Sequence, residues 1–147
     1  MAIIDWYSRY ILGWAISTTL EADFCIQAVA LALKHNWTEI FNVDQGVQFT
    51  CQDFINLLLN AGIKVSMDGK GRALDNIYIE RFWRSIKHEW IYLHCINTVA
   101  EMMQAVKEYI QYYNFQRPHQ SLNYQTPAQV YKQHGGIIVP DNTIILN

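Results

Sequence analysis

Residues 70–90 read KGRALDNIYIERFWRSIKHEW, and this stretch decides the fold. From Ile79 onward, apolar residues recur at the three- and four-residue spacing of a helix that is buried along one side. This stripe consists of Ile79, Phe82, Trp83, Ile86 and Trp90. The same spacing gathers Glu80, Arg84 and Lys87 on the opposite face. The pattern predicts a long amphipathic helix over 75–94 that turns an acid and two cations away from the core.

Upstream of this helix, short β-prone runs alternate with helical patterns. Residues 2–5 and 10–18 predict an antiparallel hairpin closed by the polar residues 6–9. A helix is expected over 19–35 with Thr19 as its cap, followed by a strand over 38–44. A second helix, over 51–61, is expected to be capped by Thr50 and closed by Gly62, with a strand over 63–67 after it. The Gly-rich residues 67–74 predict a loop.

Downstream, the chain is predicted to be mainly helical. Residues 98–115 form a helical pattern entered through Asn97 or Thr98 and ended by Arg117-Pro118. Thr126-Pro127 has the cap-then-proline order of a helix start, so a short helix is expected over 128–133. The tail, residues 135–147, has no helical period and predicts a loose strand. This order of elements predicts an α/β domain, residues 1–134, with helices packed on a mixed sheet.

Composition narrows the class of protein. The chain has 147 residues, 51% of them hydrophobic, and a formal net charge of -2. This apolar fraction supports a real core, and the weak charge means that any DNA contact must come from a local basic face. No apolar stretch is long enough to span a membrane. Cys25, Cys51 and Cys95 are odd in number and widely spaced, which predicts reduced, buried thiols of an intracellular protein.

Asp44 and Glu80 form the most informative pair of residues. Asp44 ends the expected strand over 38–44, and the carboxyl ends of strands in open α/β sheets are where ligands bind. Glu80 projects from the long helix, and two acids on rigid elements can share divalent metal ions, which prefer carboxylate oxygens. Two such ions assist phosphoryl transfer by holding both the attacking and the leaving oxygen. No convincing third carboxylate is found in the sequence.

Several residues near this pair have two interpretations. Arg84 and Lys87 suit contact with DNA phosphates, but a solvated face with ion pairs at i,i+4 spacing explains them equally. Asp75 and Asn76 fit a helix N-cap. Basic side chains around the loop either clamp a phosphate backbone or are simply solvated; they are Lys64, Lys70 and Arg72. Arg117 and His119 could contact DNA, although a surface corner around Pro118 is the simpler interpretation. The five histidines show no zinc-binding pattern.

Four motifs together resemble bacterial insertion-sequence transposases of the retroviral-integrase-like superfamily. VDQGVQFT at 43–50 resembles their second-acid motif, and residues 70–90 resemble the helix that carries their third acid. YYNFQRPHQSLNYQTPAQVY at 112–131 resembles their C-terminal signature, and IIDWYSRYILGWAIS at 3–17 resembles the strand pair after their first acid. The motifs occur in the family's order and cover residues 1 to about 134.

The resemblance implies a ribonuclease-H-like fold and Mg²⁺- or Mn²⁺-dependent cleavage and joining of insertion-sequence ends. Asp44 and Glu80 would be the second and third metal-binding acids, and Lys87 would contact DNA near the transposon end. Asn76 and the basic residues Lys70, Arg72 and Arg84 join the expected DNA contacts. The family's first acid lies on a strand before residues 3–17, and Asp5 does not match it. We therefore expect a fold that lacks its first strand and binds metal weakly.

The expected partners are DNA and other transposase chains, as a homo-oligomer or a hetero-oligomer with a full-length copy. The expected location is the bacterial cytoplasm, on the nucleoid when DNA is bound. Three alternatives remain open. The chain is a catalytically impaired piece of a transposase, a non-catalytic protein that regulates a full-length transposase by hetero-oligomerisation, or a ribonuclease-H-type nucleic-acid binder. A decayed remnant without present function is a further possibility.

Overall fold

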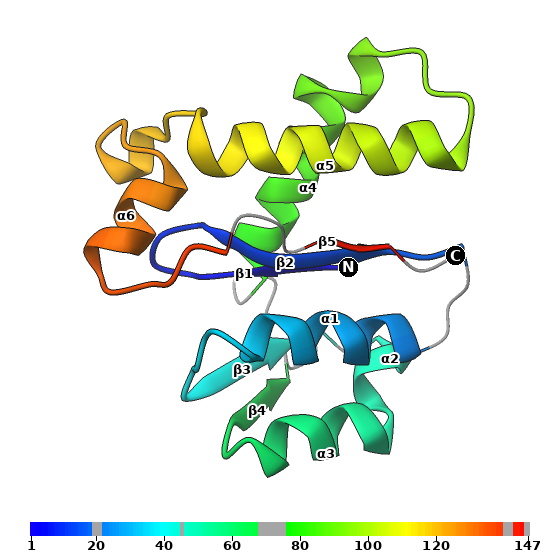
Figure 1. Cartoon of the computed structure of the whole chain (residues 1–147), viewed down its shortest axis with the longest axis vertical. Coiled ribbons are helices and arrows are strands. Elements are labelled where there is room, and N and C mark those ends of the chain that lie inside the picture. Colours follow the sequence, from blue (N-terminus) through cyan, green and yellow to red (C-terminus); the bar gives the residue numbers. More distant parts are fainter. Residues whose placement is uncertain (19–21, 45, 68–75, 140–142, 146–147) are drawn as a thin grey trace.

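The computed structural model describes residues 1–18, 22–44, 46–67, 76–139 and the backbone of 143–145 (Figure 1). The strands are β1 (Ala2–Ile4), β2 (Ile11–Ile16), β3 (Ile40–Val43), β4 (Lys64–Met67) and β5 (Thr143–Ile145). The α-helices are α1 (Asp23–Leu33), α2 (Val47–Thr50), α3 (Gln52–Asn60), α4 (Ile77–Glu89), α5 (Val99–Phe115) and α6 (Pro127–Gln133). Two short 3-10 helices, η1 (Ile91–Leu93) and η2 (Gln120–Leu122), complete the elements.

The strands pair in two hydrogen-bonded groups. β1 and β2 form the predicted antiparallel hairpin, with Ala2 opposite Trp14 and a bulge after Ile3. The tail strand β5 adds to the other edge of β2 in parallel. β3 and β4 are parallel, from Ile40 opposite Lys64 onward. The expected combination of parallel and antiparallel pairing is confirmed, but among the described strands it is divided into sheets of three and two strands.

Helices cover both faces of the three-stranded sheet (Figure 1). In the view of Figure 1, α1 and α3 lie below the sheet, while α4 and α5 lie above it. Side chains of a strand alternate between faces, and β1 follows this rule: Ile3 packs toward α1, whereas Ala2 and Ile4 pack toward α4. The hairpin is thus buried on both sides, which explains why its strands have no charged residue.

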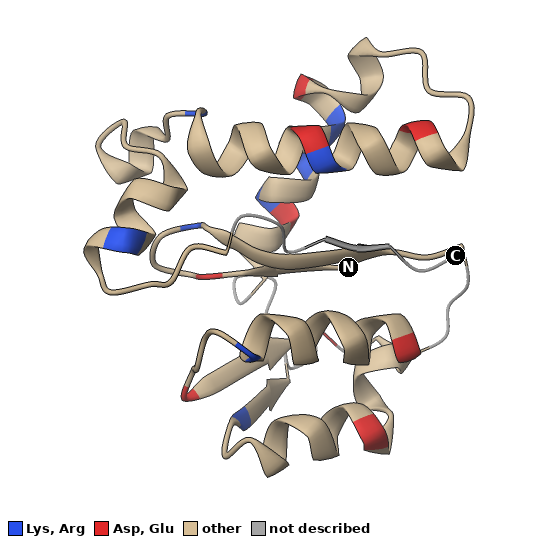
Figure 2. Cartoon of the chain, viewed as in Figure 1, with Lys and Arg blue, Asp and Glu red and all other residues tan. Residues whose placement is uncertain are grey.

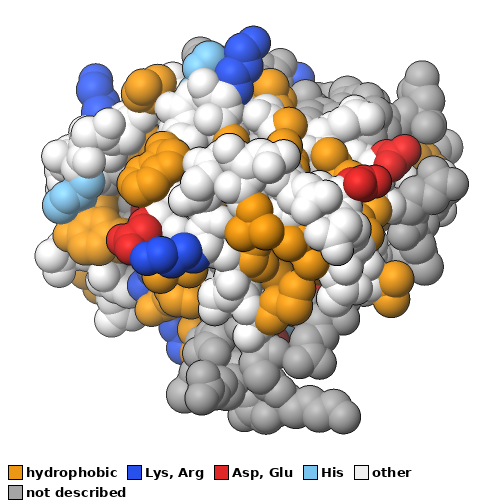
Figure 3. Space-filling model, turned by 90° about the horizontal axis from the view of Figure 1, so that it is seen from below, with side chains coloured by type: hydrophobic (Ala, Val, Ile, Leu, Met, Phe, Trp, Pro, Cys, Tyr) orange, Lys and Arg blue, Asp and Glu red, His pale blue; other side chains and the backbone are white. Residues whose placement is uncertain are grey.

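Charged residues lie on helices, on loops and on β4, and they are absent from the strands of the hairpin (Figure 2). Helix α4 carries acids and cations in close sequence, as the amphipathic pattern predicts. Seen from the side of α3, cations are scattered and in part lie against acids, and hydrophobic and polar side chains are intermixed between them (Figure 3). The described part of this face therefore has no concentrated basic patch.

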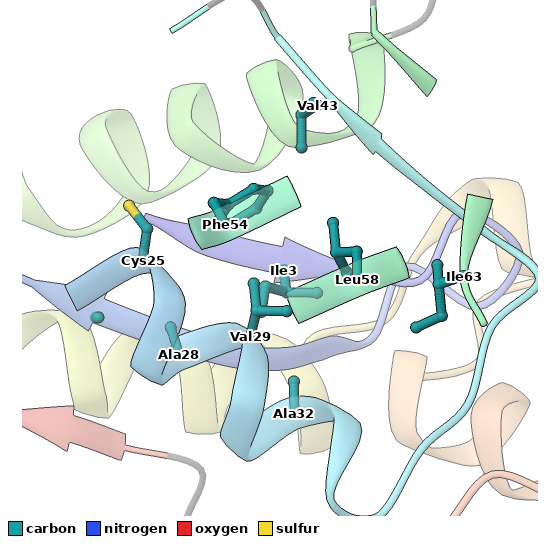
Figure 4. Packing of buried hydrophobic residues seen from close by; sticks show 10 residues of the cluster. Ile3, Cys25, Ala28, Val29, Ala32, Val43, Phe54, Leu58 and Ile63 are labelled. Atoms are coloured by element: carbon teal, nitrogen blue, oxygen red, sulfur yellow. The ribbon is translucent and has the colours of Figure 1, made fainter. Parts of the chain in front are cut away.

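The lower core fills the space between the sheet and the α1–α3 layer. Phe54 and Leu58 of α3 are fully buried and meet Val29 of α1 and Ile3 of β1 (Figure 4). Val43, the last residue of β3, closes this cluster from the side of the two-stranded sheet. The small side chains of α1 facing the hairpin allow close approach, since a Cβ on Gly13 would already contact Ala32 at 3.5 Å. This packing fixes the end of β3, from which Asp44 extends.

The upper core is aromatic and joins α4 and α5 to the hairpin. Phe82 and Ile86 of α4 are buried against Tyr109 and Tyr113 of α5 and Trp14 of β2. The other stripe positions, Ile79, Trp83 and Trp90, pack at its margin. The stripe predicted from the sequence is therefore confirmed as the face of α4 that meets the core.

The helix ends test the caps that the sequence predicted. Thr98 and Thr126 each form a capping box, with Glu101 and Gln129 respectively, as the cap positions predicted. The prediction for Thr50 is wrong: it is the last residue of α2, and its hydroxyl donates to the Val47 carbonyl at 3.1 Å. An extra helical turn before α3 displaced the cap. Gly62, with φ 74°, follows α3 as expected.

Three further predictions need correction. Helix α1 begins at Asp23 with Ala22 at its N-cap, so Thr19, which lies outside the described residues, is not the cap. Helix α4 ends at Glu89 instead of continuing to His94, because the backbone of Trp90 turns to φ -137° and starts η1. The three thiols are all free, but only Cys25 is buried; Cys51 is partly exposed and Cys95 is exposed. Among the described helices, none is long and apolar enough to cross a membrane.

Candidate metal and nucleic-acid site

Asp44 follows directly after β3 and is exposed. Its Oδ1 accepts a hydrogen bond of 2.7 Å from the Gly46 backbone N–H, which holds the carboxylate in a tight turn. A Cβ on Gly46 would lie 2.8 Å from that same oxygen, so the glycine makes room for the acid. Burial raises the pKa of the Cys25 thiol to about 11, and the negative charge of Asp44 adds to this effect.

Glu80 lies in the first turn of α4 and is exposed. Its backbone N–H donates to the Asn76 carbonyl at 3.1 Å, and its neighbour Ile79 packs into the upper core. Within the described residues, no hydrogen bond or ion pair engages the Glu80 carboxylate, and Arg84 forms none with it. The interpretation of this face as a row of i,i+4 ion pairs is therefore not supported, and the carboxylate is available to a ligand.

The predicted cationic residues are divided between α4 and the loop before it. Arg84 and Lys87 are exposed on α4, on the face away from the aromatic core. Asn76 is the N-cap residue of α4, but its side chain makes no capping hydrogen bond. Lys70 and Arg72 lie outside the described residues. Lys64, on β4, forms an exposed 2.9 Å ion pair with Glu39 and so belongs to a different region from Glu80.

The donor set fits a divalent ion only in part. Asp44 and Glu80 supply the carboxylate oxygens that Mg²⁺ and Mn²⁺ prefer, and both carboxylates are exposed. However, no group of three or more His, Cys, Asp or Glu residues able to hold a metal occurs within the described ranges. Asp5 does not add a ligand, because its carboxylate accepts from the N–H and hydroxyl of Ser8 in the hairpin turn. The described residues thus show no complete set of metal ligands, and a metal role for Asp44 and Glu80 stays a prediction.

Arg117 has a role that the sequence did not reveal. Its Nε and Nη2 donate to the two carboxylate oxygens of Glu89, at 2.7 and 2.6 Å. The Tyr109 hydroxyl donates to the same carboxylate at 2.9 Å. Pro118 is exposed, as expected of a surface corner, but Arg117 and Glu89 beside it are partly buried and paired with each other. The sequence does show an arginine, which can donate two hydrogen bonds at once, directly after an aromatic helix. It does not show the acceptor, because Glu89 lies 28 residues earlier in the chain.

His119 lies next to the Arg117–Glu89 ion pair. Its ring meets Tyr113 edge-on, with centroids 4.6 Å apart. Burial, and secondly the nearby Arg117 charge, lower the pKa of His119 from 6.5 to about 4. The hydrogen bonds from Arg117 lower the pKa of Glu89. At neutral pH the His119 imidazole is therefore uncharged, and the Glu89 carboxylate is ionised beside the Arg117 guanidinium. His119 accordingly brings no positive charge to a contact with DNA.

Two models of the integrase core domain family match this chain, one over residues 1–73 and the other over residues 61–127. Together they include Asp44 and Glu80 as well as Arg117. The overlap falls on β4 and the segment after it, so the two matches follow one another along the chain without a gap.

Curated relatives of this chain are transposases. It is 32% identical, over 133 residues, to the transposase for insertion sequence element IS904 of Lactococcus lactis subsp. lactis. It is 31% identical, over 134 residues, to the putative transposase InsK for insertion sequence element IS150 of Escherichia coli. These matches cover 88% and 89% of this chain but 53% and 47% of the relatives. The chain thus spans about half the length of the curated relatives it matches.

Solved structures with a similar fold are retroviral integrase cores. The catalytic core domain of BIV integrase matches with a TM-score of 0.70 at 16% identity, covering 91% of this chain and 85% of that one. The HTLV-2 integrase catalytic core domain, solved in complex with magnesium, matches with a TM-score of 0.67 at 20% identity, covering 86% and 80%. At such low identity the likeness establishes the ribonuclease-H-like fold. The two family matches and the transposase relatives show that this chain belongs to the integrase core domain family.

Proposed function

We propose that this chain acts in DNA transposition, as the part of a transposase core that supplies two of its metal-binding acids and a contact to DNA. The observation that carries the proposal is the outer face of α4. It presents the uncommitted Glu80 carboxylate together with the exposed cations Arg84 and Lys87. An acid bordered by cations suits a site that holds a metal ion and also touches a DNA phosphate. The named activity of the transposase relatives supports this assignment.

The residues have separate roles in this proposal. Asp44 and Glu80 bind the divalent ions, which would stabilise the attacking and leaving oxygens of strand cleavage and joining when bound. Arg84 and Lys87 hold the DNA backbone along α4, and Lys87 contacts the insertion-sequence end. Asn76, Lys70 and Arg72 extend this contact toward the start of α4. A helix face with fixed spacing would orient the phosphate next to Glu80.

We further propose that the chain alone is strongly impaired in catalysis. Two carboxylates bind a divalent ion weakly, and a missing ligand removes electrostatic stabilisation from the transition state. The third carboxylate would have to come from another segment or another chain. Assembly with a full-length transposase would provide it, and would also make this chain a regulator of that transposase.

A second function, as an interaction protein, is favoured by one surface. Tyr92, Leu93 and Val99 are 67%, 72% and 50% exposed around the turn from α4 to α5. Such a group of large apolar side chains is typical of a contact surface. Among the similar structures, HTLV-2 integrase cores are described in dimeric and trimeric forms. Co-purification with a full-length relative, lost on Leu93→Ser, would support this function, and monomeric behaviour without effect on transposition would exclude it.

The proposed chemistry can be tested with Mn²⁺, whose binding is followed by electron paramagnetic resonance. We expect weak binding that Asp44→Asn or Glu80→Gln abolishes and that Asp53→Asn, an exposed acid at the start of α3, leaves unchanged. The same proteins are then incubated with supercoiled plasmid and Mn²⁺, and with an RNA–DNA hybrid. Strong nicking that needs both acids would overturn the proposed impairment. Cleavage of the hybrid alone would favour a ribonuclease-H-type enzyme.

A further inference from the structure

Helix α4 is held at its N-terminal end by Arg9 of the hairpin turn. The Arg9 guanidinium carbon lies 3.4 Å from the ring centroid of Tyr78, two residues before Glu80. Arg9 adopts φ 65°, and its backbone N–H donates to the Asp5 carbonyl at 2.8 Å, so the turn fixes the direction of its side chain. Its Nη1 is buried without a hydrogen-bond partner. Stacking on the ring, together with the edge-on contact of Trp6 with the same ring at 6.1 Å between centroids, is therefore a described contact that holds this end.

The other end of α4 is held by Arg117. Its two-point hydrogen bonding to Glu89, reinforced by the Tyr109 hydroxyl, ties the last residue of α4 to the end of α5. A bidentate pair of this kind fixes orientation as well as distance. Arg117 itself is fixed, because its backbone N–H donates to the Tyr112 carbonyl at 2.8 Å.

The two contacts share one side of the helix. Tyr78 and Glu89 are eleven residues apart, which at 3.6 residues per turn places them within about 20° of each other around the axis. Glu80 lies about 160–180° away from both by the same count, and Arg84 and Lys87 follow it. The anchored side also borders the buried stripe. Whatever fixes the anchored side therefore fixes the direction in which Glu80 points.

We infer that Arg9 and Arg117 are positioning residues for Glu80. Apolar packing tolerates small rotations and shifts of a helix, whereas a stacked guanidinium and a two-point ion pair do not. Two such contacts, at the first and last turns, prevent α4 from turning or sliding between the hairpin and α5. The metal-binding part of this inference rests on the proposed function of Glu80. The anchoring itself does not.

The test uses the full chain with Arg9→Lys and Arg117→Lys, which keep the charge but lose the planar, forked group. Arg81→Lys, on an exposed position of the same helix, is the matched control. We expect each anchor variant to weaken Mn²⁺ binding by about tenfold, the loss typical of residues that orient a metal ligand. Hydrogen exchange should accelerate in the α4 amides and remain unchanged in α1 and α3.

The outcomes separate the two ideas. If wild-type Mn²⁺ binding does not depend on Glu80, the metal role proposed above fails, and hydrogen exchange alone decides on the anchors. If binding depends on Glu80 but the anchor variants behave like Arg81→Lys, the positioning role is wrong. Unchanged exchange in α4 overturns the inference in every case.

Discussion

Asn114 and Ile11 exchange two hydrogen bonds across 103 residues of sequence. The Ile11 backbone N–H donates to Asn114 Oδ1 at 2.9 Å, and Asn114 Nδ2 donates to the Ile11 carbonyl at 3.0 Å. Both residues are buried. The side-chain amide thus pairs with β2 as a strand backbone would, and it fixes α5 on the hairpin.

Asn114→Ala should therefore be strongly destabilising. It leaves a buried N–H and a buried C=O of Ile11 without partners, which predicts a loss of roughly 2–4 kcal/mol in the free energy of unfolding. Urea unfolding followed by tryptophan fluorescence measures it. Asn60→Ala, at the exposed end of α3, is the control and should change little. Equal effects of the two variants would contradict the role of the Asn114 pairing.

A second prediction compares two neighbouring residues of α3, of which only one is buried in the lower core. Leu58 is fully buried, whereas Leu59 is 55% exposed on the same helix. Leu58→Ala should lower the free energy of unfolding by about 2–5 kcal/mol, because it removes transfer energy and leaves a cavity. Leu59→Ala should cost less than about 1 kcal/mol. Thermal unfolding of both variants tests whether α3 is packed as described.

Acidification should destabilise the protein through His119. Its folded-state pKa of about 4 lies below the ordinary value of 6.5, so the unfolded chain takes up a proton first as the pH falls. The free energy of unfolding should fall between about pH 6.5 and 4, by less than about 1.4 kcal/mol per pH unit because solvent screens a partly buried group. Glu89, with its lowered pKa, adds a loss at still lower pH.

The pH dependence is checked by urea unfolding at several pH values. His119→Asn should flatten the profile between pH 6.5 and 4.5, whereas His35→Asn, at an exposed position, should leave it as in the wild type. A wild-type profile that is already flat in this range would show that His119 titrates normally.

Binding of duplex DNA should depend on the outer face of α4. Arg84→Ala and Lys87→Ala should each weaken binding and lower the salt dependence by about one unit of log K against log salt, as expected for one phosphate contact. Lys64→Ala is the matched control, since Lys64 is paired with Glu39 away from α4. Fluorescence anisotropy at several salt concentrations provides the measurement. An equal effect of Lys64→Ala would indicate diffuse attraction instead of a defined contact.

Much of this architecture follows from local sequence. The period of the α4 stripe, the Thr98 and Thr126 caps and the alternating hairpin strands are all determined by neighbouring residues, and the structure confirms them. The position of Glu80 opposite the stripe follows from helical spacing. These features need no knowledge of distant contacts.

The features that were missed depend on residues far apart in the chain. The pairing of Arg117 with Glu89 and of Asn114 with Ile11 appears only when α4, α5 and β2 are packed together. The Thr50 cap was misplaced because residues Val47–Thr50 form the separate helix α2. The distribution of strands over two sheets likewise depends on which edges meet, and spacing within a strand does not specify this.

The hairpin of β1 and β2 is the shared wall of two otherwise separate cores. One core joins it to α1, α3 and β3, and the other joins it to α4 and α5. The two acids belong to different halves, since Asp44 follows the lower core and Glu80 borders the upper one. Loosening either half would therefore disrupt the proposed metal site even if the other half stayed folded. Formation of the proposed site would thus report whether the two halves fold cooperatively across the hairpin.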